Sequence, residues 1–272
     1  MMVTISDKEF KQLSDYIHEN YGIYLKEEKQ MLVVGRLHSV LQQAGFSSFT
    51  EYFNHVVTDR SGEAVITLLN KITTNHTFFM READHFYYLR DKVLPSLVKS
   101  IGDRDMRIWC AACSSGEEAY TLAMVIDDYM GRGKLLWDTK ILATDISDKV
   151  LNTAKAGIYS NERIAPLPSI WKNCYFEPVD SENSILTDRI RNEVIYRKLN
   201  LMDAVFPFKK KFHVIFCRNV MIYFDNETKI KLLDKMYNLL EDGGWLFIGH
   251  SESLDREAAR FRFVVPAVYK KE

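Results

Sequence analysis

Residues 107–123 read RIWCAACSSGEEAYTLA, and this stretch decides the fold. The apolar run RIWCAA is short enough for one buried strand, whereas helical spacing begins only at Glu117. Between them, CSSG contains small residues and Gly116, so the chain can turn sharply and bring backbone N–H groups close to a ligand. The stretch therefore predicts a strand, a ligand-binding turn and a helix.

The same alternation of strand and helix continues to the end of the chain. It predicts an α/β fold, with a mostly parallel sheet that carries helices on both faces. Near the end, RFVVPAVYK (262–270) fits a terminal hairpin or a bent edge strand, because Pro266 interrupts it. The other expected strands are KILATD (140–145), VIYRKLN (194–200), HVIFCRN (213–219) and GWLFIG (244–249).

The first part of the chain has helical periodicity only. Ser6 and Glu9 form a capping box at the start, and a second helix is expected over about residues 28–44. We therefore expect a small all-helical domain over residues 1–75 and the α/β domain over 76–272. Residues 157–194 have little helical period, so we expect an inserted β-subdomain there.

Composition excludes several classes of protein. The 272 residues carry 36 Lys and Arg against 37 Asp and Glu, so bulk charge attracts neither nucleic acid nor an acidic membrane. The start, MMVTISDKEF, lacks the basic and apolar regions typical of a signal peptide, and no apolar run approaches the ~20 residues that span a bilayer. The four cysteines do not form a disulfide framework. We expect a cytoplasmic protein without membrane insertion.

The turn after the first strand selects its ligand by charge. A nicotinamide dinucleotide site requires G-x-G-x-x-G, and acidic side chains in the first helical turn repel its phosphates. This turn has one glycine followed by Glu117 and Glu118. The second strand ends at Asp145, which can accept hydrogen bonds from a ribose or serve as a helix cap or turn residue. Together these carboxylates favour a cationic nucleoside without phosphate, S-adenosylmethionine.

The pair Cys110 and Cys113 raises the alternative of a redox site. In such a site the first cysteine stands at a helix N-terminus, which lowers the pKa of its thiol. Here Cys110 still belongs to the strand, and the helix begins after Cys113. No second cysteine pair completes a zinc site. We therefore expect buried packing and no metal.

Six motifs in one order resemble the CheR-type chemotaxis receptor glutamate methyltransferases over nearly the whole chain. The resemblance implies a Rossmann-like domain that transfers a methyl group from S-adenosylmethionine to glutamate side chains on chemoreceptor cytoplasmic helices, giving glutamyl methyl esters and S-adenosylhomocysteine. The motifs are TTNHTFFMREADHF (73–86), AACSSGEEAY (111–120), ATDIS (143–147), NLMD (200–203), FCRNVMIYF (216–224) and GHSES (249–253).

The resemblance also implies functional residues. It assigns Arg81 and Tyr223 to the reacting centre, and one of Glu117 and Glu118, with Glu118 favoured, to the amino group of the cofactor. Asp145 corresponds to the ribose ligand. The other positions that the resemblance implies for the cofactor are Asn75, Thr77, Arg81, Asn200, Leu201, Arg218 and Asn219.

Partners and alternatives follow from the same comparison. The β-subdomain over 157–194 stands where some members of the family dock a C-terminal receptor peptide. The second helix retains Lys29 and Arg36 but is less basic than is common in the family. A nicotinamide-dependent oxidoreductase is disfavoured by the missing glycines. A non-catalytic S-adenosylmethionine-binding module that docks receptors remains the alternative.

Overall fold

The computed structural model describes residues 3–74, 76–254 and 260–272. Its packing divides these residues into two units. The first unit runs to His76 and also includes Tyr223–Thr228, and the second comprises Thr77–Ile222 and Lys229–Glu272. The first unit therefore draws on two separate parts of the sequence.

The first unit is a bundle of short helices, and the predicted capping box is confirmed. Ser6 accepts a hydrogen bond from the backbone N–H of Glu9, and the Glu9 carboxylate accepts one from the Ser6 backbone. Fully buried apolar side chains from α1, α2 and α4 form its core. The helices are α1 (Asp7–Tyr21), η1 (Glu27–Lys29), α2 (Gln30–Ala44), α3 (Phe49–Thr58) and α4 (Glu63–Ile72).

The returning segment Tyr223–Thr228 is held within this first unit. Phe224 pairs with Ile23 in an isolated antiparallel bridge. His18 Nε2 lies 2.8 Å from the carboxylate of Asp225. The Tyr223 hydroxyl accepts a hydrogen bond from the backbone N–H of Thr74 at 2.8 Å and donates to the Thr74 carbonyl at 3.2 Å.

The second unit is built on a seven-stranded sheet of order β6-β2-β1-β7-β8-β10-β9. The first five strands are parallel, and β10 pairs antiparallel with both β8 and β9, so the predicted mostly parallel sheet with an antiparallel end is confirmed. The strands are β1 (Ile108–Cys110), β2 (Ile141–Asp145), β6 (Val194–Lys198), β7 (Phe212–Cys217), β8 (Leu240–Ile248), β9 (Arg262–Val265) and β10 (Val268–Lys270).

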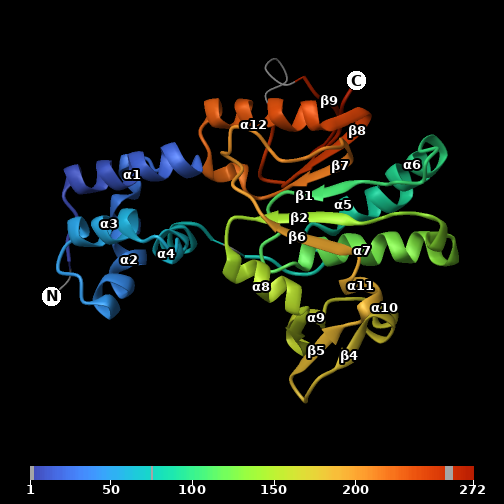
Figure 1. Ribbon diagram of the computed structural model, residues 1–272, viewed down its shortest axis with the longest axis horizontal. Helices are drawn as coiled ribbons and strands as arrows, with labels where there is room; N and C mark the ends of the chain where they lie inside the picture. The colour runs from blue at the N-terminus through green and yellow to red at the C-terminus, as the bar shows by residue number, and fades with distance from the viewer. Residues whose placement is uncertain (1–2, 75, 255–259) are drawn as a thin grey trace. The chain divides into compact units, whose positions relative to one another are not determined.

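Helices cover both faces of this sheet, as the alternating pattern predicts. Figure 1 shows α12 over one face and α7 over the other. The helical stretch before β1 contains a π-helical segment, η2, which the spacing of apolar residues does not predict. The elements are α5 (Ala83–Tyr88), η2 (Leu89–Val93), α6 (Leu94–Ser100), α7 (Glu117–Met130), η3 (Gly131–Leu136), α8 (Asp148–Ala156), η4 (Met221–Tyr223) and α12 (Asn226–Leu239).

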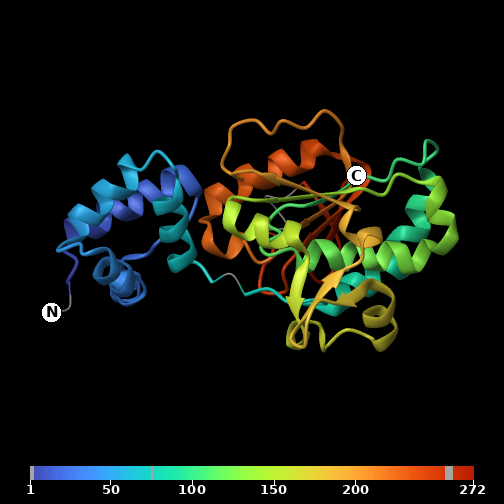
Figure 2. The same cartoon turned by 60° about the horizontal axis from the view of Figure 1, so that its bottom comes forward.

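Between β2 and β6 in the sequence, the chain also forms a separate three-stranded antiparallel sheet of order β3-β5-β4. Figure 2 shows it below the main sheet, in yellow, with the short helices α9 and α10 beside it. Its elements are β3 (Ile158–Ser160), α9 (Asn161–Ile164), α10 (Ser169–Tyr175), β4 (Phe176–Pro178), β5 (Asn183–Leu186) and α11 (Asp188–Arg191).

The order of the strands reverses at β1. The chain passes from β1 to β2 and β6 on one side, and then crosses to β7 and β8 on the other. In open α/β sheets a ligand binds at the carboxyl ends of the strands where such a reversal occurs. The ends of β1 and β7, at Cys110 and Cys217, therefore mark the candidate site.

Candidate functional site

A buried arginine stands at this reversal point. Arg218 follows β7 directly, and its side chain has no exposed surface. One guanidinium nitrogen donates to Glu118 at 2.8 Å and another donates to Glu82 at 2.9 Å. The guanidinium carbon also lies 5.3 Å from the ring centroid of Phe86 and 6.0 Å from that of Phe216. Two carboxylates offset the cost of removing this cation from water.

Glu82 collects several donors from separate loops. The oxygen that pairs with Arg218 also accepts a hydrogen bond from the backbone N–H of His250 at 3.1 Å, and the other oxygen accepts one from the side-chain amide of Asn219 at 3.0 Å. Burial by itself would raise the pKa of Glu82, but the hydrogen bonds from Arg218 and Asn219 and the charge of Arg218 lower it to about 2. Glu82 is therefore a carboxylate at neutral pH.

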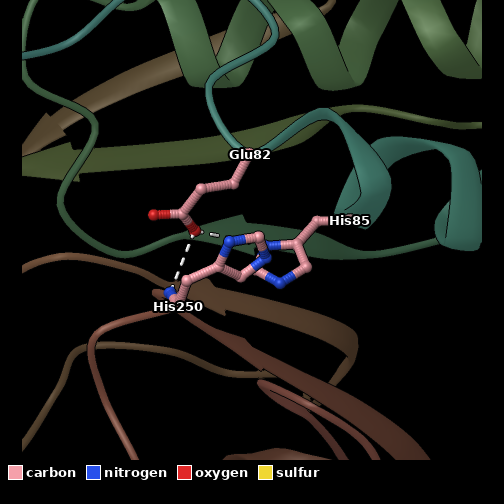
Figure 3. A group of neighbouring side chains, drawn as sticks. All are labelled: Glu82, His85 and His250. Carbon is pink, nitrogen blue, oxygen red and sulfur yellow. Dashed lines mark hydrogen bonds and ion pairs between the residues drawn. The ribbon is translucent and has the colours of Figure 1, made fainter.

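Two histidines lie beside Glu82 (Figure 3). The ring of His85 packs edge-on against that of His250, with centroids 4.6 Å apart, and neither ring nitrogen of His85 has a hydrogen-bond partner among the described residues. Burial, followed by the charge of Arg218, lowers the pKa of His85 to about 4, so its ring is neutral at pH 7.

Glu82, His85 and His250 each offer one ligand atom to a metal, within 4.8 Å of one another. However, Glu82 already accepts hydrogen bonds from three donors, and the guanidinium of Arg218 would repel a cation bound there. We therefore interpret the three residues as a scaffold around Arg218, in which Glu82 and His250 are hydrogen-bonded and His85 is held by packing.

The two adjacent carboxylates after the first turn have different surroundings. Glu118 faces the reversal point, where it pairs with Arg218 and accepts a hydrogen bond from the thiol of Cys110 at 3.1 Å. Glu117 is fully buried, pairs with Arg163 of α9, and accepts a hydrogen bond from the Ser115 hydroxyl at 2.8 Å. Glu118 therefore faces the candidate ligand site, whereas Glu117 joins α7 to the small sheet region.

Asp145 is the last residue of β2, and its carboxylate accepts hydrogen bonds from the turns that follow β1 and β2. One oxygen accepts from the backbone N–H of Ser114 at 2.9 Å and the other from that of Ser147 at 3.0 Å. Burial raises the pKa of Asp145, and these hydrogen bonds oppose the rise. Ser147, not Asp145, is the N-cap residue of α8. Each carboxylate oxygen has two lone pairs, so Asp145 retains acceptors for a further ligand.

The thiols beside this site are not set up for redox chemistry. Cys110 lies in β1, and both Cys110 and Cys113 are free and buried, as the sequence predicts. Burial raises the pKa of each thiol well above its ordinary value. A redox-active cysteine needs the opposite shift.

The remaining residues suggested by the motifs lie in several places. Thr77 and Arg81 belong to the second unit and are half-buried, and the carbonyl of Arg81 accepts a hydrogen bond from Arg218. Asn200 accepts from the backbone N–H of Met202 at 3.0 Å, and its neighbour Leu201 is buried.

Tyr223 belongs to the first unit, and Asn75 lies outside the described residues. The structure thus gathers Arg218, Asn219 and Glu118 at the reversal point. To these it adds Glu82, which sequence reasoning did not select although it directly follows Arg81 in a recognised motif.

Comparison with known proteins identifies the family. Residues 75–269 match the model of the CheR methyltransferase SAM binding domain, and residues 8–73 match that of the CheR methyltransferase all-alpha domain. The chain belongs to the CheR methyltransferase family. A chemotaxis protein methyltransferase of Borreliella burgdorferi is 43% identical over 99% of this chain and 96% of its own length. Chemotaxis protein methyltransferase 1 of Pseudomonas aeruginosa is 35% identical, over 96% of each chain.

Membership of the CheR family agrees with the chemistry of the site. The protein is an S-adenosylmethionine-dependent methyltransferase, and the predicted cofactor is confirmed. The residues present fit this cofactor, because the reversal point carries two carboxylates for one buried cation and its turn has a single glycine in place of a phosphate-binding loop. Among the described residues, no helix has the length and apolar character needed to cross a bilayer.

Proposed function

We propose that this CheR-family protein methylates glutamate side-chain carboxylates on the cytoplasmic helices of chemoreceptors, giving glutamyl methyl esters. The names of its relatives and the motif pattern support a chemotaxis substrate. The observation that carries the proposal is the buried Arg218, which is shared between Glu82 and Glu118. One positive and two negative charges leave an acidic surplus, which favours a cationic ligand.

When bound, S-adenosylmethionine supplies a methyl group carried on a sulfonium sulfur. We assign Glu118 to its amino group in preference to Glu117, because Glu117 is buried against Arg163. Asp145 is assigned to the ribose hydroxyls, for which its oxygens retain lone pairs. The other residues proposed to hold the cofactor are Asn75, Thr77, Asn200, Leu201, Arg218 and Asn219.

The acceptor group explains why the site needs no general base. A glutamate carboxylate has an unperturbed pKa of ~4.3 and is already ionised at neutral pH. The useful contributions of the protein are alignment of the reacting groups and exclusion of water. We assign orientation of a carboxylate to Arg81, because a guanidinium can bind it through two parallel hydrogen bonds. Tyr223 is the second residue proposed for the reacting centre.

The small sheet suggests a second contact with the receptor. Its order leaves β3 and β4 as edge strands, and an edge strand can pair with an extended peptide. We include in the proposal a receptor C-terminal peptide that docks on this sheet. Comparing receptor fragments with and without that peptide tests this part separately, since its loss should raise KM and leave kcat unchanged.

The main test is incubation of the protein with a chemoreceptor cytoplasmic fragment and labelled S-adenosylmethionine. We expect label in the fragment that is released by mild base, and mass spectrometry should locate it on glutamate residues. Cofactor binding without incorporation would contradict the proposal and would support a non-catalytic docking module. Arg81→Ala should sharply reduce incorporation without unfolding the protein, whereas the exposed Arg132→Ala serves as the matched control.

A further inference from the structure

The segment GHSES (249–253) follows β8, and the functional assignment above gives it no role. Its Glu252 side chain reaches the turn that follows β7. One carboxylate oxygen accepts from the backbone N–H of Asn219 at 2.9 Å and from that of Gly249 at 2.6 Å. The other accepts from the backbone N–H of Ile222 at 3.1 Å. Glu252 thus joins the turns that follow two neighbouring parallel strands.

The turn that Glu252 holds has an unfavourable backbone conformation. Asn219 has φ of 58°, in the left-handed region that residues other than glycine adopt uncommonly, although asparagine adopts it more readily than most. Such a conformation persists only where surrounding contacts enforce it. The carboxylate supplies such a contact at the Asn219 N–H, and the Asn219 side chain donates to Glu82.

The same segment packs against Asn219 without a gap. A Cβ atom added at Gly249 would lie 2.4 Å from the Asn219 side-chain nitrogen and 3.0 Å from its backbone nitrogen. The next residue, His250, donates its backbone N–H to Glu82 at 3.1 Å. The segment therefore fixes Asn219 by contact and also holds Glu82, which is the carboxylate that pairs with Arg218.

Glu252 does not have the geometry of a general base. Both oxygens of Glu252 accept hydrogen bonds from backbone N–H groups. In addition, the glutamate carboxylate that would receive the methyl group has no proton for a base to remove. Its contacts instead end on the peptide groups that place Asn219, directly after Arg218.

We propose that Glu252 is a positioning residue, whose carboxylate sets the Arg218–Asn219 turn in the geometry that the cofactor requires. This inference rests on the assignment of Arg218 and Asn219 to the cofactor. It adds two residues, Glu252 and Gly249, that act through that turn and do not touch the reacting atoms.

The decisive variant is Glu252→Gln, which replaces one acceptor oxygen with an NH2 group facing N–H donors. We expect the dissociation constant for S-adenosylhomocysteine, measured by calorimetry, to rise about ten- to hundredfold. The KM for a receptor fragment should stay within about twofold, because receptor contacts are unchanged. Glu252→Asp keeps the charge and should recover part of the affinity. Glu19→Gln, at an exposed position of α1, is the matched control.

Gly249→Ala provides a second route that leaves the Glu252 carboxylate intact. Its methyl group should displace Asn219 and also weaken S-adenosylhomocysteine binding, so the inference can be tested even if Glu252→Gln does not fold. Wild-type affinity in a folded Glu252→Gln or Gly249→Ala protein would overturn the inference. Because calorimetry needs no receptor, a weakened variant supports positioning even if the receptor is never methylated, in which case only the proposed function fails.

Discussion

Two clusters of charged side chains lie at opposite ends of the parallel strands of the main sheet, here called its carboxyl edge and its amino edge. One has a cation between carboxylates, and the other has a carboxylate between cations. At the carboxyl edge, the single cation Arg218 lies between Glu82 and Glu118. At the amino edge, the buried carboxylate Asp127, near the end of α7, lies between Lys134 at 3.3 Å and Arg189 at 2.7 Å. Both clusters solve the problem of burying a charge by surrounding it with opposite charges.

The difference between them indicates which cluster serves a ligand. At the amino edge, Lys134 also pairs with Glu193 at 3.1 Å, and Lys140 pairs with Glu193 at 3.4 Å, so three cations meet two carboxylates and no surplus carboxylate remains. Tyr175 donates to Asp127 at 2.9 Å, and this cluster joins α7 to the small sheet region. At the carboxyl edge the surplus carboxylate is not balanced within the cluster, and it lies where the strand order reverses.

The comparison is tested most severely by removing Arg218. Arg218→Ala leaves the partly buried carboxylates Glu82 and Glu118 without an opposite charge, and we expect the free energy of unfolding to fall by about 3 kcal/mol. S-adenosylhomocysteine binding should weaken by about a hundredfold or more, because the two charge-assisted hydrogen bonds by which Arg218 holds Glu118 and Glu82 in place are lost. Urea unfolding and calorimetry measure the two effects. Arg90→Ala, at a surface pair with Asp91, should change neither.

The pH dependence of Glu82 gives the next largest effect. Its pKa of about 2 lies below the ordinary 4.5, so its contribution to stability is present above pH 4.5 and is lost as pH falls toward 2. The shift corresponds to about 3 kcal/mol. Urea unfolding of the wild type and Glu82→Gln should therefore differ most above pH 5 and converge only as pH approaches 2. A difference that stays constant over this range would contradict the assigned pKa.

Asp127→Asn tests the structural role of the amino-edge cluster. The free energy of unfolding should fall by about 1.5–3 kcal/mol, because hydrogen bonds to a charged group are weakened. The affinity for S-adenosylhomocysteine should not change, since this cluster lies at the other edge of the sheet. Calorimetry and urea unfolding on the same protein decide the point. An affinity loss as large as that of Arg218→Ala would remove the distinction between the two clusters.

The smallest expected effect comes from a test that distinguishes the roles of the neighbouring side chains Glu117 and Glu118. Glu118→Gln should raise the dissociation constant for S-adenosylhomocysteine about tenfold, because it removes one charged acceptor. Glu117→Gln is its matched partner and should instead lower stability, since Glu117 pairs with Arg163 in a buried setting. If Glu117→Gln weakens binding more than Glu118→Gln, the roles assigned to the two residues must be exchanged.

The parts of the site that the sequence predicts are those close to strand ends. Glu118 and Asp145 could be selected because parallel strands bring their carboxyl ends to one edge. The choice between Glu117 and Glu118 could not be made from spacing, because adjacent helical residues point about 100° apart and only packing tells which faces the ligand. The family resemblance, not the spacing, suggested Arg218 and Asn219.

Other parts depend on contacts between distant segments. Glu82 and Glu252 meet the turn after β7 across 137 and 33 residues of sequence, so no local pattern connects them. The π-helical segment η2 has the apolar spacing of an ordinary α-helix, so the sequence pattern does not predict it. The strands themselves were predicted well, because their apolar runs are bounded by turn residues.

The return of Tyr223–Thr228 to the first unit matters for protein engineering. A gene fragment that stops near codon 74 would encode the helices without the segment that pairs with Ile23 and hydrogen-bonds to Thr74. Chimaeras that exchange only the amino-terminal part between relatives would combine the helical bundle of one parent with the segment Tyr223–Thr228 of the other. Recombination should therefore carry both pieces together, as a discontinuous cassette.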